Sequence, residues 1–305
     1  MNSITGALGP LFLLILLGGV IGYRRWPSLE FWAQMEKLIY FVLFPAMLVA
    51  TLATADVSQV PVARLAAVLL GAIGLMTGLL WGLRSWIRLD SPAFTSVFQG
   101  AIRFNTYVGV AGAGALHGSA GVTTAAVAVA VMVPVVNILC VASFIRAGTL
   151  GQASLGQSAL TLLKNPLILA CLAGIFLNVS GIGLPGWSGS AAELLGRAAL
   201  PLGLVAVGVA LRPAALWRLD RGTLTTNVAK LLLMPLVVLL LAWVLGLDPL
   251  SRDVALLFAA LPTATSAYIL ARQLGGDAEL MAAIITGQTL LAMLTLPLWL
   301  KLAGV

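Results

Sequence analysis

Charged side chains are scarce in this chain of 305 residues: only 9% are Asp, Glu, Lys or Arg, whereas 61% are hydrophobic. Soluble domains carry about 25% charged residues, so this chain has too few charges to cover a surface that faces water. Apolar stretches of about 20 residues recur along the whole sequence, and each is long enough to cross a hydrocarbon core of about 30 Å. The composition therefore predicts an all-α integral membrane protein.

Histidine, cysteine and membrane-embedded acids are also rare, which excludes several kinds of chemistry. A single histidine rules out an HExxH zinc site, and the sequence has neither a GxxxxGK[ST] loop nor a convincing GxSxG triad. Cys140 and Cys171 lie in apolar stretches and form no disulfide framework. No acidic residue falls at the centre of an apolar stretch, so a proton mechanism based on paired acids is not expected. We expect no enzyme, no cofactor and no metal centre, and leave open Na⁺ coupling through carbonyl, Asn and Thr oxygens.

The hydropathy pattern predicts ten transmembrane helices. The connecting segments are short and hold most of the charges, and none is long enough to separate soluble domains. Residues 1–9 carry no Lys or Arg, which argues against a cleavable signal peptide. The predicted spans are 5–23, 32–54, 61–83, 92–117, 119–145, 157–180, 189–211, 222–246, 250–274 and 277–302.

Basic residues between the spans predict the orientation. The net charge of +7 is consistent with nucleic-acid binding in principle, but basic cytoplasmic loops explain it better because these residues lie between spans. With both termini outside, the cytoplasmic loops hold ten basic residues: Arg24, Arg25, Arg84, Arg88, Arg146, Lys164, Arg212, Arg218, Arg221 and Arg272. The external side holds four: Arg64, Arg197, Arg252 and Lys301. The asymmetry predicts external, periplasmic N- and C-termini.

The two halves of the sequence resemble each other. PLFLLILLG at 10–18 matches PLILACLAG at 166–174 in five of nine positions, and PAMLVA at 45–50 matches PLGLVA at 201–206 in four of six, both at an offset of 156. We therefore expect a first five-helix repeat at 1–150 and a second at 151–305. Because five is odd, the second repeat must be inverted in the membrane, a common construction in secondary transporters.

Polar residues interrupt the fourth and ninth spans at corresponding depths. The fourth contains FQGAIRFNTYVGV (98–110), and the ninth contains LPTATSAYIL (261–270). Pro262 removes a backbone donor and disfavours helix at the residue before it. Two broken helices at matching positions of inverted repeats predict a binding site near the midplane, where half-helix N-termini favour anions. The predicted substrate-binding residues are Arg103, Asn105, Thr106, Pro262, Thr263, Thr265, Ser266 and Gln288.

Structural roles compete with this functional interpretation. Arg103 also fits snorkelling to the surface or pairing with freed carbonyls, and the hydroxyl and amide side chains of both breaks also fit helix capping. Gln288 is balanced between a site residue and a bond between helices, whereas Asn137 fits the latter better. His117 is expected at the interface, and Lys230 is expected to snorkel.

The chain resembles the auxin efflux carrier family, which includes bacterial malate and malonate permeases. The similarity covers nearly the whole sequence. It rests on FPAMLVATLA, FQGAIRFNTYVGVAG with ALHGSAG, KNPLILACLAGIFLNVSGIGLP, ALPLGLVAVGVAL, KLLLMPL and LPTATSAYIL with ARQLGGD. The short basic segment after the fifth span resembles a bacterial member, expected in the inner membrane, rather than a plant hormone exporter.

The resemblance implies a fold and a mechanism. It implies ten helices arranged as in sodium–proton antiporters and bile-acid symporters, with spans one, two, six and seven as a scaffold that dimerises. Spans three to five and eight to ten would form a moving transport domain in which spans four and nine cross. It further implies that small organic anions move by an elevator-type mechanism, with the Arg103-x-Asn105 and Pro262 regions as functional positions.

These observations favour a secondary transporter of mono- or dicarboxylates in the lipid bilayer, with no nucleic-acid partner. A channel-like anion pore is one alternative. A membrane receptor or assembly subunit without transport is the other.

Overall fold

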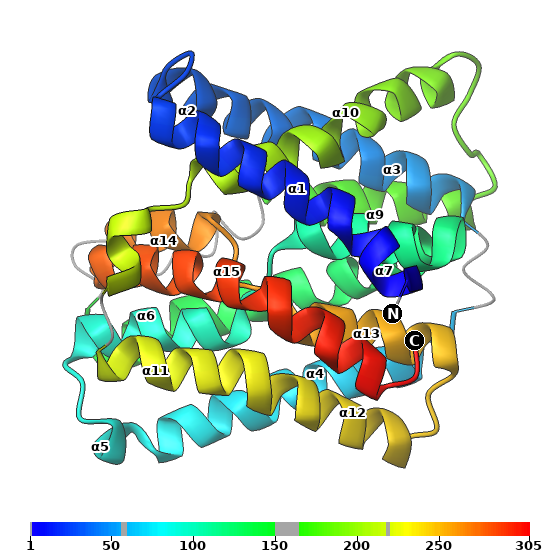
Figure 1. Cartoon of the computed structure of the whole chain (residues 1–305). Coiled ribbons are helices and arrows are strands. Elements are labelled where there is room, and N and C mark those ends of the chain that lie inside the picture. The colour runs from blue at the N-terminus through cyan, green and yellow to red at the C-terminus, as the bar shows by residue number, and fades with distance from the viewer. Residues whose placement is uncertain (1, 56–59, 150–164, 218–219) are drawn as a thin grey trace. The chain divides into compact units, whose positions relative to one another are not determined.

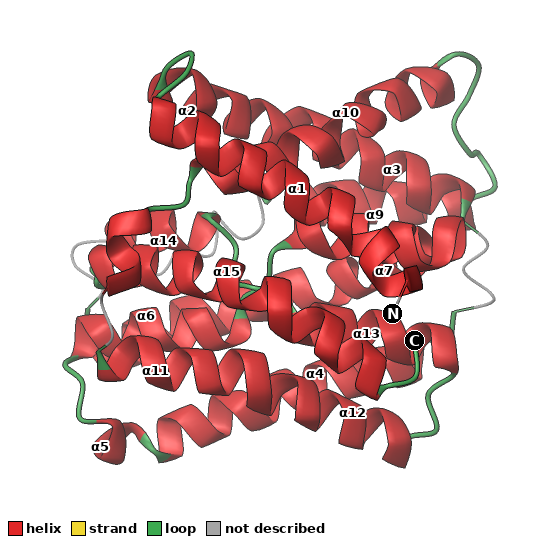
Figure 2. Cartoon of the chain, in the orientation of Figure 1, coloured by secondary structure: helices red, strands yellow, loops and turns green. Residues whose placement is uncertain are grey.

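The described part of the computed structural model comprises residues 2–55, 60–149, 165–217 and 220–305, and it contains helices and loops but no strands (Figure 2). The all-helical class predicted from composition is confirmed for these residues. The first eight residues of the predicted sixth span, the last of which is Lys164, lie outside them, as does Arg218.

The helices follow one another along the chain as Figure 1 labels them. Two of the elements, η1 and η4, are π-helical turns inside longer helices, and η3 is a 3₁₀ turn. The bounds are α1 Asn2–Arg24, α2 Leu29–Leu38, η1 Ile39–Leu43, α3 Phe44–Thr54, α4 Val62–Gly82, α5 Arg84–Ile87, α6 Ser91–Ile102, α7 Thr106–Ala147, α9 Pro166–Val179, α10 Ser188–Val209, η3 Pro213–Trp217, α11 Arg221–Val228, η4 Ala229–Leu233, α12 Met234–Val244, α13 Pro249–Ala260, α14 Ser266–Leu274 and α15 Ala278–Leu302.

Seven segments of the described residues are long and apolar enough to cross a membrane. The number is lower than the ten predicted spans for three reasons. The segment Ser91–Ala147 is 57 residues long and covers two predicted spans, which are separated by a kink where Gly118 adopts φ 59°. Residues 157–164 of the sixth span lie outside the described part, which leaves α9 with 14 residues. The ninth span is interrupted, so that α13 and α14 have 12 and 9 residues.

The chain forms two compact units, and each unit draws segments from both halves of the sequence. Unit 1 comprises residues 1–62, 106–133 and 163–211, and unit 2 comprises 63–105, 134–162 and 212–305. The long helix α7 contributes its first part to unit 1 and its last part to unit 2.

Glycines allow two helices of unit 1 to approach closely. A Cβ on Gly18 of α1 would lie 2.1 Å from the carbonyl oxygen of Val205 in α10. A Cβ on Gly208 of α10 would lie 1.9 Å from the carbonyl oxygen of Ile15 in α1. These distances are far below van der Waals contact, so only hydrogen fits at these positions, as is typical of small-residue helix packing in membranes.

The contact between α9 and α3 in unit 1 repeats this arrangement. A Cβ on Gly174 of α9 would lie 3.3 Å from both Cα and the carbonyl oxygen of Val49 in α3. Gly174 and Val49 are the positions that the offset of 156 relates to Gly18 and Val205. At the end of α3, the Asn178 amide of α9 also donates to the carbonyls of Leu52, Ala53 and Ala55, at 3.0, 3.3 and 2.8 Å. These carbonyls have no helical donor beyond the helix end, so Asn178 supplies one.

Aspartates begin the helices around the core of unit 2. Asp90, Asp220, Asp248 and Asp277 are the N-caps of α6, α11, α13 and α15, and each side chain accepts a hydrogen bond from the amide three residues ahead, at 2.8–3.0 Å. A carboxylate at this position satisfies an orphan amide and complements the helix dipole. Helix α15 packs against α6, α11, α13 and α14 and so holds the unit together.

Both π-helical turns end just before a proline that is the second residue of the following helix. Turn η1 precedes Pro45 of α3, and η4 precedes Pro235 of α12. Proline cannot donate to the preceding turn and its ring needs room there, so the wider turn accommodates the ring without ending the helix.

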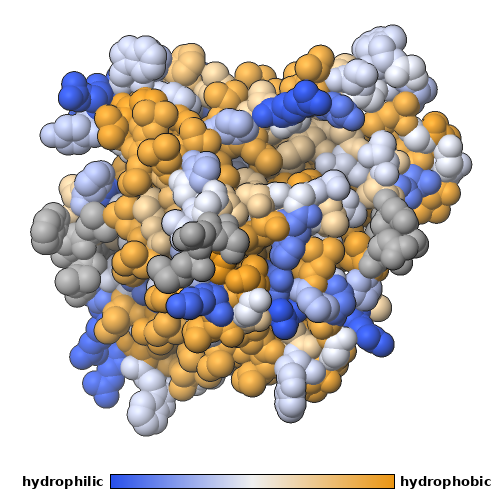
Figure 3. All heavy atoms as spheres, turned by 45° about the vertical axis from the view of Figure 1, so that its right-hand side comes forward, coloured by the Kyte–Doolittle hydropathy of each residue, from blue (hydrophilic) through white to orange (hydrophobic). Residues whose placement is uncertain are grey.

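Large apolar side chains cover much of the surface. Figure 3 shows one face on which hydrophobic residues predominate. Trp243 and Val179 are 81% and 80% exposed, and many leucines on the membrane helices are more than 40% exposed. Exposed apolar surface of this extent requires lipid as the solvent.

Candidate functional site at two helix breaks

The first helix break separates α6 from α7 at residues 103–105. Helix α6 makes its last internal bond from the Arg103 amide to the Gln99 carbonyl at 2.9 Å, after which Arg103 is extended, with φ −75° and ψ 158°. The amide of Asn105 then donates to the carbonyl of Pro262 at 2.8 Å instead of to its own helix. The break therefore falls inside the predicted stretch, and it meets the second break.

The second break separates α13 from α14 at residues 261–265. Leu261 is extended, with φ −67° and ψ 149°, as expected for a residue that precedes proline. The carbonyl of Pro262 is free of helical partners and accepts the bond from Asn105. The sequence predicted both breaks, and their meeting through a backbone hydrogen bond is a finding of the structure.

Three buried groups join the two breaks to α15. The Gly100 carbonyl accepts bonds from the Thr263 hydroxyl at 2.7 Å and from Nε2 of Gln288 at 3.1 Å. Oε1 of Gln288 accepts a bond from the Thr263 amide at 2.9 Å. Thr263 and Gln288 are both fully buried. We refer to Gly100, Thr263 and Gln288 as the buried triad; it satisfies polar groups that a helix break leaves without partners inside a membrane.

Arg103 is held between two other elements of unit 2. Its Nη1 donates to Oδ1 of Asn137 in α7 at 3.0 Å, and its Nη2 donates to the Ser266 hydroxyl in α14 at 3.2 Å. A guanidinium has five N–H groups, so these bonds leave donors for a ligand. No ion pair found among the described residues includes Arg103. A positive charge without a carboxylate partner at this depth attracts an anion.

Burial divides the predicted site residues into two groups. Asn105, Pro262, Thr263 and Gln288 are buried, whereas Arg103, Thr106, Thr265 and Ser266 are partly exposed. Within unit 2, the partly exposed residues at the breaks are therefore those that a small molecule can reach. Thr106 is the first residue of α7 and belongs to unit 1.

Two interpretations of polar side chains change with the structure. Capping of α14 by Thr263, Thr265 and Ser266 was the alternative to a role in the site; Thr265 occupies the N-cap without a side-chain capping bond, and the other two hydroxyls bond to Gly100 and Arg103. Lys230 was expected to snorkel but is only 1% exposed, because it lies in the π turn η4, which packs against α13, α6 and α15.

Sequence reasoning underrated Asn137, which it interpreted as a bond between helices. The structure makes this side chain the acceptor that orients Arg103. The available signal was its depth in an apolar stretch, but nothing in the sequence identified its partner 34 residues away.

Comparisons with known proteins agree with a membrane transporter. A family model described as "Membrane transport protein" matches residues 3–300. The chain is 27% identical over 310 residues to a protein of Rhizobium meliloti (strain 1021) named "Putative malonate transporter", covering 97% of this chain and 94% of that protein. It is 26% identical over 297 residues to an "Uncharacterized transporter" of Methanothermobacter thermautotrophicus, with 94% of each chain covered.

Proposed function

The chain belongs to the auxin efflux carrier family of membrane transport proteins, and from this premise we propose that it is a secondary carrier of small organic anions, mono- or dicarboxylates such as malate or malonate. It is a transporter of the membrane and not an enzyme. The name of the Rhizobium meliloti relative suggests the dicarboxylate class.

The observation that carries the proposal is the setting of Arg103. Its guanidinium is partly exposed, bonded to Asn137 and Ser266, and lacks an ion-pair partner among the described residues. Arginine binds a carboxylate through two parallel N–H···O bonds, a geometry that fits this class of substrate. In this proposal the anion binds Arg103 beside Ser266 and Thr265, while the buried triad keeps the two breaks together.

We further propose ten transmembrane helices in two inverted repeats, at 1–150 and 151–305. The paired glycine contacts support this arrangement. At an offset of 156, Gly18 corresponds to Gly174 and Val49 corresponds to Val205. The contact of Gly18 with Val205 in one half therefore has its counterpart in the contact of Gly174 with Val49. Gly118 and Gly275, which are 157 residues apart and so one position from the offset of 156, both have positive φ, at 59° and 77°.

Alternating access is proposed to occur by an elevator-type motion of unit 2 against unit 1. Unit 1 contains the first, second and seventh predicted spans and most of the sixth, which are the proposed scaffold and homodimer contact, but it also contains residues 106–133 of the fourth and fifth spans, which the resemblance assigns to the transport domain. Unit 2 contains both breaks and all the bonds described among them, which suits a domain that carries its substrate as one piece. The proposed setting is a bacterial inner membrane with both termini periplasmic. A potential of 100 mV, negative inside, favours export of each anionic charge by about 2.3 kcal/mol.

Flux into proteoliposomes tests the proposal. The purified chain is reconstituted, and initial rates of labelled malonate, malate and acetate are measured with Na⁺ or K⁺ outside and with or without internal unlabelled acid. We expect saturable uptake of at least one acid that internal acid stimulates. Unsaturable flux would favour the channel-like alternative, and no flux of any acid in correctly folded protein would favour a receptor or assembly subunit.

Variants at the site make the test specific. Arg103→Ala is expected to reduce the initial rate to less than about a tenth, a loss of at least about 1.4 kcal/mol of binding or transition-state energy. Arg103→Lys keeps the charge but not the two-pronged geometry, so an intermediate rate is expected. Arg197→Ala serves as the control. It removes an exposed arginine whose Nη2 lies 3.9 Å from Oε2 of Glu193. Equal rates for wild type and Arg103→Ala would refute the assignment of the site.

A further inference from the structure

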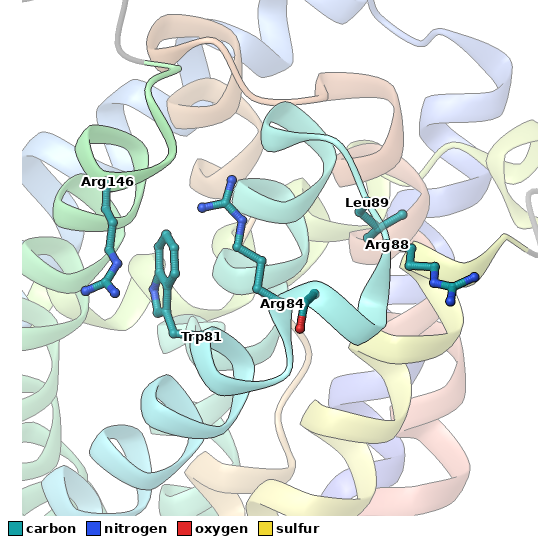
Figure 4. A pocket seen from close by; sticks show the side chains of 6 residues that line it. Trp81, Arg84, Arg88, Leu89 and Arg146 are labelled. Carbon is teal, nitrogen blue, oxygen red and sulfur yellow. The ribbon is translucent and has the colours of Figure 1, made fainter.

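Two arginines enclose one tryptophan in unit 2, away from the helix breaks. Trp81 lies near the end of α4, Arg84 begins α5, and Arg146 is the penultimate residue of α7. The guanidinium carbons of Arg84 and Arg146 lie 5.0 and 4.7 Å from the centroid of the Trp81 ring. Figure 4 shows the ring between the two arginines, which extend from different elements.

Fixed contacts hold these groups in place. Nη2 of Arg84 donates to the Ser91 hydroxyl at 2.9 Å, and its guanidinium also lies 5.0 Å from the centroid of Phe94. Cation–π contacts with Trp81 orient both guanidinium planes. The remaining N–H groups of both arginines are available to a ligand, because no other hydrogen bond of either is found among the described residues.

The surrounding cavity is strongly positive. It has a volume of about 590 Å³ and is lined by Trp81, Arg84, Ser85, Arg88, Leu89 and Arg146, which we call the arginine pocket. No acidic residue lines it, and no ion pair within the described segments involves its arginines. The like charges of Arg84 and Arg146 on the two sides of one ring repel each other, so an anion bound between them would relieve the repulsion.

Arg88 lies at the edge of this pocket. It ends α5 in the left-handed conformation, with φ 53° and ψ 44°. In Figure 4 its side chain extends away from Trp81 and Arg84, so the positive charge beside the ring comes from Arg84 and Arg146.

An exposed apolar face of α7 leads to this pocket. Ile138, Ala142 and Ile145 follow the i, i+4, i+7 spacing of one helix face, and Ile138 and Ile145 are 53% and 41% exposed. Arg146 directly follows this face. A ligand that occupies both regions needs an anionic group next to a long hydrocarbon chain.

We propose that the arginine pocket binds the phosphodiester headgroup of an anionic phospholipid, with an acyl chain along Ile138, Ala142 and Ile145. Arginine pairs with phosphate through two N–H groups, tryptophan is common at the membrane interface, and basic pockets between transmembrane helices bind anionic headgroups. The lipid site is separate from the proposed carboxylate site and does not depend on it.

Native mass spectrometry of the full chain in detergent tests the proposal. The protein is titrated with phosphatidylglycerol, with phosphatidylcholine of the same chains, and with inorganic phosphate as a competitor. We expect one phosphatidylglycerol to bind at least tenfold more tightly than phosphatidylcholine, and millimolar phosphate to leave it bound. Equal binding of the two lipids would overturn the proposal, and complete displacement by phosphate would reassign the pocket to free phosphate.

Charge-matched variants locate the lipid. Arg84→Gln with Arg146→Gln is expected to weaken the phosphatidylglycerol site at least tenfold, whereas Arg64→Gln with Arg221→Gln removes the same charge elsewhere in unit 2 and should change it less than twofold. Arg146→Gln alone is a second probe, because Arg146 contacts the Trp81 ring without a hydrogen bond among the described residues, so this variant should keep the thermal midpoint and still weaken binding. If the double variant does not fold, unchanged affinity in Arg146→Gln alone would count against the pocket.

Discussion

Replacing Gln288 with methionine tests the bonds that join the two helix breaks. Methionine has nearly the volume of glutamine but neither donates to Gly100 nor accepts from Thr263. The Gly100 carbonyl keeps the Thr263 hydroxyl at 2.7 Å, so it stays satisfied. The Thr263 amide loses its acceptor at 2.9 Å and is left alone in a fully buried place.

The expected loss of stability follows from these contacts. One buried unsatisfied donor costs about 1–3 kcal/mol, and the lost bond to Gly100 adds about 0.5–1.5 kcal/mol. We therefore expect Gln288→Met to destabilise the protein by about 2–4 kcal/mol. On the scale of soluble domains of 150–250 residues, 1 kcal/mol shifts the thermal midpoint by about 2–4 °C, so the midpoint should fall by several degrees.

The two buried cysteines provide the assay. Cys140 and Cys171 are both inaccessible in the folded chain, so a thiol-reactive dye reports their exposure during heating. Thr289→Val is the matched control. Thr289 is the residue next to Gln288, and its hydroxyl donates only to the Ile285 carbonyl of its own helix, at 2.7 Å. Equal midpoints for Gln288→Met and Thr289→Val would refute the structural role of the buried triad.

Three further substitutions have defined outcomes. Gly18→Ala should lower the thermal midpoint because its Cβ would clash with the Val205 carbonyl of α10. Gly19→Ala is the control, since the atom nearest to its Cβ would lie 3.9 Å away, and it should change the midpoint by less than about 2 °C. Equal shifts for the two variants would contradict the close packing. Asn137→Asp puts a carboxylate beside Arg103, and so should raise the KM for a carboxylate at least tenfold; an unchanged KM would remove Arg103 from the binding site. Asn178→Leu leaves three carbonyls at the end of α3 without their shared donor, and a midpoint lowered by several degrees in the same dye assay is expected; an unchanged midpoint would show that they find other partners.

Local chemistry made part of this fold predictable from the sequence. Pro262 lacks a backbone N–H and disfavours helix at the residue before it, so the ninth predicted span was expected to break near it, as the structure shows at Leu261. Composition alone predicted the membrane and the helical class. These properties depend on a residue and its immediate neighbours, which a single sequence contains.

Partnerships across the chain were not predictable in the same way. From the sequence, Thr263 and Ser266 fit either the binding site or helix caps, and nothing in it identified the acceptor and donor that they meet, which are 163 residues away. Asn137 illustrates the same limit, since an amide in an apolar stretch fits many bonds and only tertiary packing selects Arg103. The π turns before Pro45 and Pro235 also depend on a balance within the helix that residue types alone do not decide.

The buried triad restricts how a gate can operate in this molecule. The Gly100 carbonyl accepts bonds from two side chains, and Gln288 also accepts a bond from the Thr263 amide, so unwinding either break further would leave several buried polar groups without partners at once. We therefore expect the two breaks to move as one piece, with any bending that admits or releases a substrate in segments outside them.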